Sequence, residues 1–293
     1  MKNIVGLFGT ESSGKTVFLA VLFHELKTGK IKELTLNILK DNESEKYLNF
    51  IAEDLYQNKI LPSKTDERYA QKIVIDLGQQ DEKKDVVISK FRLETYDLSG
   101  EALFELLTNE NLKDNNNKNQ DLNINDKNIP IQGQSNVFIN LKKAIDSLIN
   151  QSSSFMFMVD PNPMIRFKQD RFFTAILRQI IITNQKKKWL KSNSVIKNVS
   201  IAFVLSKSDL YPQNRHTERE LQRLIPQSWN LAKQLYFNRN RIKEFYISSL
   251  GYNINYNILE DGTKFPIVPE NIEPVNVIEP LIWFKEQFKT YKK

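Results

Sequence analysis

One stretch near the N-terminus constrains this chain more than any other: residues 9–16 read Gly-Thr-Glu-Ser-Ser-Gly-Lys-Thr. They follow the apolar residues 4–8 and precede the apolar residues 17–23. This is the pattern G-x-x-x-x-G-K-[ST] between a strand and a helix, which predicts a loop that binds nucleotide phosphates. A plain turn before a buried helix is the alternative, but spacing and flanks together favour the phosphate loop.

Each part of this loop has an expected task. The glycines let the backbone curl so that successive N–H groups point at phosphate oxygens, and the following helix adds the positive end of its dipole. Lys15 is expected to reach the β- and γ-phosphates, and the Thr16 hydroxyl to bind Mg²⁺. The predicted nucleotide-binding set in this region is Gly9, Thr10, Glu11, Ser12, Ser13, Gly14, Lys15, Thr16 and Val17.

The composition removes several classes of site. The chain has no cysteine, which excludes disulfides, thiolate chemistry, prenylation and palmitoylation, and two histidines cannot build a histidine-rich metal site. The net charge of +7 permits an acidic partner without indicating nucleic acid. A first strand near Asn3 leaves no room for a signal peptide, and no apolar run approaches a membrane span. We therefore expect a cytoplasmic protein with no direct lipid anchor.

Apolar runs and helical periodicities alternate along the rest of the chain. Expected helices cover residues 15–27, 44–58, 137–150, 167–188, 217–237 (interrupted near Pro226) and 277–288, and expected strands cover 72–77, 85–96, 154–160, 199–205 and 245–247, with a weak extra strand at 34–39. The short polar connection at 78–84 predicts an antiparallel hairpin. The sequence therefore predicts an α/β fold in three layers, with a mostly parallel sheet, one antiparallel hairpin strand and helices on both faces.

No linker divides the chain, so we expect one domain over residues 1–293. A helix is inserted at about 40–60. Residues 109–136 are rich in Asn, Asp and Lys, and we expect a mobile polar insert there.

Two strand ends carry further polar motifs. The strand at 85–96 ends in Asp97-Leu98-Ser99-Gly100, which offers a carboxylate for the Mg²⁺ side of the site. The strand at 199–205 ends in Ser206-Lys207-Ser208-Asp209. The Asp209 carboxylate can accept from guanine N1–H and from the N2 amine, whereas adenine presents an acceptor at N1. A solvated loop is the alternative, but ligands gather at such strand ends.

The ordered set of motifs at 9–16, 97–100, 206–209 and 248–250 resembles that of TRAFAC-class P-loop GTPases, the class with a Ras-like core. Two motifs depart from the usual forms, because Ser206 stands where the class has Asn or Thr and Ser-Ser-Leu replaces Ser-Ala-Lys. The extra helix and the late proline-rich stretch are similar to those of bacterial double-GTPase-type proteins of conflict and signalling operons. The resemblance assigns Ser206, Lys207, Asp209, Ser248, Ser249 and Leu250 to the base, with Lys207 tied back to the phosphate loop.

The resemblance also implies the catalytic residues. Thr65 is the expected switch threonine and third Mg²⁺ ligand beside Thr16 and Asp97, with Thr35 as second choice. The Gly100 N–H should contact the γ-phosphate, next to Lys15. Glu101 stands where Ras-like enzymes carry a water-orienting Gln. Arg68 could act as an arginine in cis, although the ordinary role of a surface arginine is favoured.

These features predict a Mg²⁺-dependent GTPase switch that cycles between GTP and GDP. Glu101 in place of Gln suggests slow intrinsic turnover, raised by an activating or effector protein or by homo- or hetero-oligomerisation. The alternative is a scaffold that binds GTP without hydrolysing it. An ATPase with a fortuitous Ser-Lys-Ser-Asp is the third possibility.

Overall fold

Three apolar runs form the centre of the sheet in the computed structural model: β1 (Ile4–Gly9), β5 (Ser154–Val159) and β6 (Ser200–Leu205). Every residue of these strands is buried, because helices cover both faces of the sheet. The structure describes residues 3–10, 12–36, 43–62, 71–81, 86–97, 132–188, 196, 198–210, 217–252, 254–258 and 264–289.

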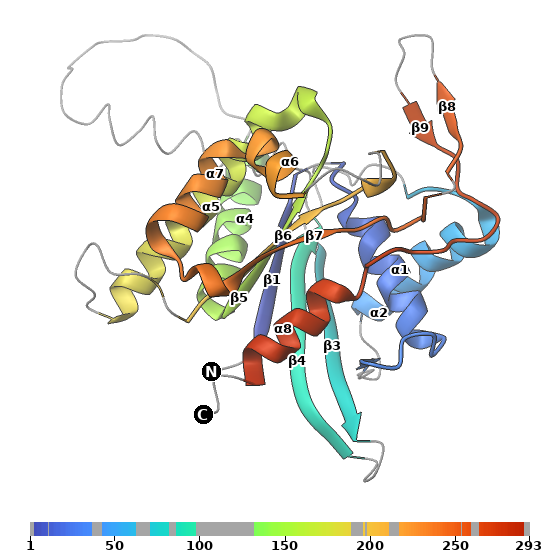
Figure 1. Cartoon of the computed structure of the whole chain (residues 1–293), viewed down its shortest axis with the longest axis horizontal. Coiled ribbons are helices and arrows are strands. Elements are labelled where there is room, and N and C mark those ends of the chain that lie inside the picture. The colour runs from blue at the N-terminus through green and yellow to red at the C-terminus, as the bar shows by residue number, and fades with distance from the viewer. Residues whose placement is uncertain are drawn as a thin grey trace.

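Seven of the described strands form the main sheet, in the order β2-β3-β4-β1-β5-β6-β7, and Figure 1 shows it running through the middle of the molecule. The remaining bounds are β2 (Thr35–Leu36), β3 (Gln71–Asp81), β4 (Val86–Asp97) and β7 (Ile242–Tyr246). Within this sheet β3 runs antiparallel to both of its neighbours, and the other pairs are parallel. The predicted hairpin is therefore confirmed.

Alternate residues of the central strands face two separate cores. On one face, Phe155 and Phe157 of β5 pack with the helices α4 (Gln132–Gln151), α5 (Arg166–Lys188), α6 (Thr217–Leu224) and α7 (Pro226–Asn230). On the other face, Met156 and Met158 pack with α1 (Lys15–Lys27), α2 (Glu43–Glu53) and α8 (Glu279–Lys289). Figure 1 shows these two helical layers on either side of the sheet. The chain has the predicted three-layer P-loop NTPase fold.

Most predicted elements lie within a few residues of their expected places. The helix at 217–237 is interrupted before Pro226, because proline cannot donate the helical hydrogen bond and its ring crowds the preceding turn. Two expectations need correction. The helix α4 begins at Gln132, so the proposed polar insert at 109–136 overlaps it, and residues 98–131 lie outside the described part. Between the expected strand at 245–247 and the expected helix at 277–288, where no strand was predicted, the chain contains a hairpin, β8 (Tyr256–Ile258) with β9 (Lys264–Pro266), whose strands are too short to show a period.

The register of the sheet places the polar motifs at one edge. Gly9 pairs with Met158, Val159 pairs with Leu205, and Leu205 pairs with Tyr246, so the four strands end side by side. Gly6 pairs with Glu94, and each lies three residues before the end of its strand. Asp97, the last residue of β4, therefore lies level with Gly9, the last residue of β1. We call this edge the rim: the segments that follow β1, β4, β5, β6 and β7.

Candidate functional site

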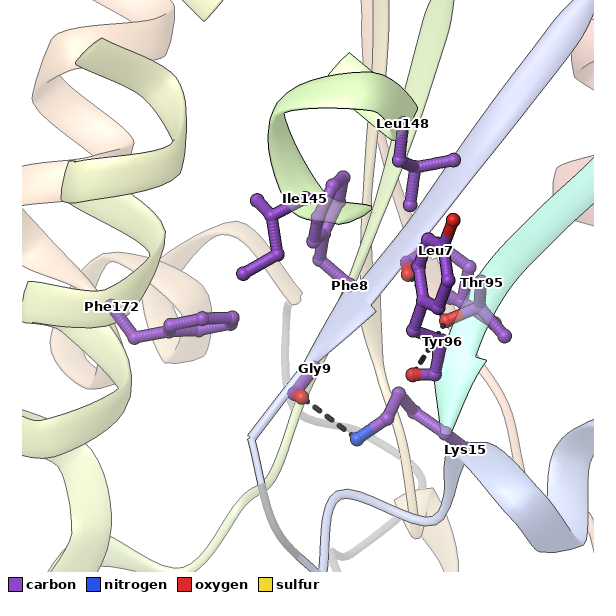
Figure 2. A pocket seen from close by; sticks show the side chains of 9 residues that line it. All are labelled: Leu7, Phe8, Gly9, Lys15, Thr95, Tyr96, Ile145, Leu148 and Phe172. Carbon is purple, nitrogen blue, oxygen red and sulfur yellow. Dashed lines mark hydrogen bonds between the residues drawn. The ribbon is translucent and has the colours of Figure 1, made fainter. Parts of the chain in front are cut away.

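The loop after β1 is held by the lysine that it contains. Lys15 begins α1 and is 93% buried, with 7% exposure. Its Nζ donates to Gly9 O at 2.7 Å and to Thr10 O at 2.9 Å, and Figure 2 shows the side chain reaching back toward Gly9. Gly14 adopts φ of +81°, a left-handed conformation that suits glycine. The cation is thus buried inside its own loop.

Gly9 is needed because the chain returns close to it. A Cβ at this position would lie 2.5 Å from Ser13 Oγ and 3.2 Å from Lys15 Cγ. Real Cβ atoms essentially never come so near a side-chain oxygen, so any other residue would push Ser13 away. The first glycine of the motif therefore permits the tight curl, and the last one permits its left-handed turn.

Two buried hydroxyls in the loop support a polar ligand. Thr10 Oγ1 and Ser13 Oγ are buried and have no hydrogen-bond partner among the residues that the structure describes. A buried polar atom left unpaired costs about 1–3 kcal/mol, so such atoms usually mark strain or a ligand. An anion with several acceptor oxygens fits this loop, whose neighbouring α1 N-terminus also favours negative charge.

The loop is backed by an apolar wall. Thr95 of β4 donates its hydroxyl to Leu7 O at 2.7 Å, which ties β4 to β1 directly behind Lys15. Figure 2 shows this bond in a small pocket lined by Leu7, Phe8, Gly9, Lys15, Thr95, Tyr96, Ile145, Leu148 and Phe172. The Thr95–Leu7 hydrogen bond and the mostly apolar lining of this pocket fix the ends of β1 and β4 relative to each other.

The loop after β6 is anchored to the end of β5. The Ser206 backbone N–H and its hydroxyl both donate to Val159 O at 3.0 Å. Lys207 adopts φ of +51°, and its Nζ donates to Asp160 Oδ2 at 2.8 Å. Asp160 is 2% exposed and accepts a second bond from the Asn162 N–H at 2.8 Å. The hydrogen bond that the structure gives Lys207 thus runs to Asp160, whereas the resemblance had tied it to the phosphate loop.

Asp209 accepts hydrogen bonds from hydroxyl groups of two other segments. Ser248 Oγ donates to Asp209 Oδ1 at 2.7 Å, and Tyr256 OH donates to Oδ2 at 2.5 Å. Burial, reinforced by the bond to Asp209, raises the pKa of Tyr256 well above its ordinary value, so the phenol stays a donor. Asp209 is half-buried, and its carboxylate is oriented from two sides.

The segment after β7 is hydrogen-bonded to the loop that carries Asp209 and to the segment around Val275. The Ser208 N–H donates to Ile247 O, and Ser248 exchanges two backbone hydrogen bonds with Val275. Leu250 is buried and Ser249 is half-buried, so both belong to this packed turn. Gly251 has φ of +97°, and a Cβ there would lie 2.7 Å from Glu273 O. The motif at 248–250 is therefore built into the rim beside Asp209.

Several predicted site residues lie outside the described part of the chain: Glu11, Thr65, Arg68, Gly100 and Glu101. Asp97 is the last residue of β4, and its side chain is likewise outside the description. Thr35 pairs with Gly78, which pairs with Lys90, seven positions before Asp97 on β4. At about 3.3 Å per residue this places Thr35 about 20 Å from the rim. It is a strand residue at this distance, so its position does not support the second choice for the switch threonine.

Sequence reasoning missed two residues of the site. Asp160 directly follows a buried strand, a position that could have marked it as a rim residue beside Lys207. Tyr256 stands 47 residues after Asp209 in a hairpin that the pattern did not reveal, and the sequence carries no signal for the pairing. Among the described residues, no cluster of His, Cys, Asp and Glu could hold a metal by itself.

One family model matches the chain: Double-GTPase 1, over residues 6–123. This part of the chain resembles the double GTPases. The matched stretch begins in β1 and includes the phosphate loop, the β3–β4 hairpin and Asp97, while Asp209 lies beyond it. The predicted similarity to double GTPases is confirmed over residues 6–123, which are less than half of the chain.

Solved structures with GTPase titles are distantly similar. The Arl6 BBS3 small GTPase of Trypanosoma brucei, with a bound nucleotide analogue, is 10% identical, with 99% of each chain covered and a TM-score of 0.35. The GTP-bound Ski7 GTPase-like domain of S. cerevisiae is 16% identical, covering 98% of this chain and 50% of that one, with a TM-score of 0.48. No curated protein matches. The fold assignment rests on the strand order of this chain, because these similarities are too distant to argue from.

Within the described segments, no helix has both the length and the hydropathy that a transmembrane span requires.

Proposed function

We propose that this protein is a guanine-nucleotide-binding switch that hydrolyses GTP slowly. The observation that carries the proposal is the placement of the phosphate loop and Asp209 on one rim, after β1 and β6, with β5 between them. Adjacent strands are about 4.8 Å apart, so the two motifs start about 10 Å from each other. One nucleotide can then contact both, its phosphates at the loop and its base at Asp209.

The phosphates are proposed to bind at residues 9–16. Lys15 exchanges a carbonyl partner for the β- and γ-phosphates, while loop N–H groups and the α1 N-terminus add further attraction. The hydroxyls of Thr10 and Ser13, buried without a described partner, support this placement because a phosphate could accept from them. Glu11, Ser12, Gly14 and Val17 complete the proposed phosphate-binding set.

The base is proposed to bind at Asp209, in a turn completed by Ser206, Lys207, Ser248, Ser249 and Leu250. Both edge donors of guanine can bond to the carboxylate, and a site built for these donors rejects a base that lacks them. Adenine would leave the Asp209 carboxylate facing an acceptor. The hydroxyl groups of Ser248 and Tyr256 donate to Asp209 and support this function because they fix the orientation of its carboxylate.

We propose that a Mg²⁺ ion binds beside the phosphates, because hydroxyl and carboxylate oxygens are the donors that it prefers. Thr16 in the first turn of α1 and Asp97 at the end of β4 would hold it, with Thr65 joining in the GTP state. When bound, the ion neutralises charge that develops on the phosphates during hydrolysis. Gly100 N–H is proposed to contact the γ-phosphate, and Glu101 to orient the attacking water.

Hydrolysis of GTP distinguishes the proposed function from the two alternatives, a scaffold that only binds GTP and an ATPase. Multiple-turnover phosphate release from GTP should be slow but measurable, and Glu101→Ala should reduce it while leaving GTP affinity unchanged. Binding of GTP with no turnover, alone or with partner proteins, would indicate a static scaffold instead. Faster release from ATP than from GTP would indicate an ATPase.

The switch itself is testable by hydrogen exchange. With a non-hydrolysable GTP analogue and Mg²⁺, protection should rise around Thr65 and Gly100 relative to GDP, because only the γ-phosphate offers them new contacts. We propose that this change alters affinity for an effector protein. Equal exchange in the two states would contradict a switch and support the scaffold.

A further inference from the structure

The phenol of Tyr256 lies on the carboxylate proposed to read the base. Tyr256 begins β8, in a two-stranded hairpin separate from the main sheet, which Figure 1 shows extending from the body of the molecule. Its hydroxyl donates to Asp209 Oδ2 at 2.5 Å, and Ser248 Oγ donates to Oδ1 at 2.7 Å. Each oxygen of Asp209 therefore already has one donor from within the chain.

The two donors are not equivalent. Ser248 Oγ also lies 2.7 Å from Gly251 O, and it accepts from the Gly251 N–H at 3.1 Å. A serine hydroxyl has one proton, so it cannot donate to Asp209 and to Gly251 O at the same time. The phenol has Asp209 as its described acceptor. Tyr256 is therefore the more constant of the two donors.

The phenol leaves room for a base on the same carboxylate. An ionised carboxylate has two oxygens with about four acceptor sites between them. Two are used by Ser248 and Tyr256, and two remain for the paired donors of guanine. A carboxylate whose plane is already fixed loses less conformational freedom when the base arrives, which favours binding.

We propose that Tyr256 is a positioning residue for base recognition, holding the Asp209 carboxylate in the orientation that accepts both edge donors of guanine. This inference rests on the proposed guanine-nucleotide function. Tyr256 acts through Asp209. By fixing the orientation of the carboxylate, it determines how well Asp209 binds the N2 amine, the second donor of guanine. Inosine lacks the N2 amine, so ITP offers one donor where GTP offers two. The positioning role therefore predicts a larger effect on GTP than on ITP.

The test is Tyr256→Phe, which removes the hydroxyl oxygen and keeps the aromatic ring. Affinities for GTP, ITP and ATP are measured by titration calorimetry on the full chain with Mg²⁺. GTP affinity should fall about threefold to tenfold, the effect expected when binding has to order one freed side chain. ITP affinity should fall by less, so the ratio of GTP to ITP affinity decreases, and ATP affinity should not change.

Tyr252→Phe is the matched control. Tyr252 is 38% exposed, and its hydroxyl lies 3.3 Å from Ser208 Oγ, so the variant removes a neighbouring phenol that does not contact Asp209. Its nucleotide affinities should equal those of the wild type. Unchanged melting temperatures show that both variants are folded, and unchanged ATP affinity shows that the phosphate loop is intact.

The outcomes separate this inference from the proposed function. An unchanged ratio of GTP to ITP affinity in Tyr256→Phe would overturn the positioning role. Tighter GTP binding in that variant would overturn it too, because the phenol would then compete with the base. A wild-type protein that does not prefer GTP over ATP contradicts the proposed function itself, whatever the variant does.

Discussion

Residues 9–16, proposed to bind the phosphates, form the phosphate end of the rim, and the turn around Asp209, proposed to bind the base, forms its base end. The two ends are built in opposite ways. The phosphate end is one continuous stretch, residues 9–16, in which Lys15 returns to the carbonyls of Gly9 and Thr10. The base end joins three segments, because Asp209 accepts from Ser248, 39 residues later, and from Tyr256, 47 residues later. One end is folded by local sequence and the other by the tertiary structure.

The two ends also differ in how their polar atoms are satisfied. At the phosphate end, Thr10 Oγ1 and Ser13 Oγ are buried without a partner among the described residues. At the base end, both oxygens of Asp209 accept hydrogen bonds. A ligand therefore contributes missing hydrogen bonds at the first end, and meets an oriented acceptor at the second. The first should govern affinity and the second should govern selectivity.

Replacing Lys15 should have the largest effect. Lys15→Ala removes charge-assisted bonds to two phosphates and should weaken GTP binding at least about 100-fold. The fold should survive, since the loop loses one side chain. Fluorescent nucleotide titration measures the effect, with Lys27→Ala as control because Lys27 is exposed at the other end of α1. Near-native affinity in Lys15→Ala would defeat the phosphate-loop assignment.

The base end should respond through selectivity. In Asp209→Asn, the new amide can donate to the 2-oxo group of xanthine while its oxygen accepts from N1–H. The ratio of GTP to XTP affinity should shift by about 100-fold toward XTP, since the contact at position 2 of the base becomes unfavourable for guanine and favourable for xanthine. Competition between the two nucleotides measures this ratio. If it does not move, Asp209 does not read the base.

The glycine at the start of the loop should affect both folding and binding. In Gly9→Ala the new Cβ would lie 2.5 Å from Ser13 Oγ, so the crowding should cost about 1–3 kcal/mol of unfolding free energy. GTP affinity should fall about tenfold as the loop shifts, because a lost hydrogen bond to a charged group has that effect. Gly29→Ala is the control: φ is +70° there and no atom lies within 4 Å, so stability should fall by about 1 kcal/mol while binding is unchanged. Denaturant unfolding and nucleotide titration separate the two effects, and normal binding by Gly9→Ala would contradict the crowding.

Removing the charge that pairs with Lys207 should have the smallest effect on GTP affinity. In Asp160→Asn the amide can still accept from the Asn162 N–H but no longer pairs with the charge of Lys207. Since the Lys207 side chain is 38% exposed, solvent screens its ion pair with Asp160. The variant should therefore lose less than about 1 kcal/mol of binding free energy, which is about threefold in GTP affinity. A loss as large as that of Asp209→Asn would mean that Asp160 contacts the nucleotide directly.

The contrast between the two ends explains what the sequence could predict. The phosphate loop was readable because its glycines, Lys15 and Thr16 are adjacent and their spacing has a geometric cause. Asp209 was readable because it follows a buried strand. Tyr256 was not, since its contact with Asp209 depends on a three-residue strand far along the chain. The position of Thr35 was not readable either, because strand register, which sets its distance from the rim, is not visible in a two-residue strand.

The most direct test of the account is a competition of ATP against GTP for the wild-type protein with Mg²⁺. Both nucleotides offer the same phosphates to residues 9–16, so any difference reports the base end alone. The account predicts GTP binding at least about 100-fold tighter than ATP, because adenine leaves the Asp209 carboxylate facing an acceptor. Equal affinity, or a preference for ATP, would contradict the claim that this rim recognises guanine.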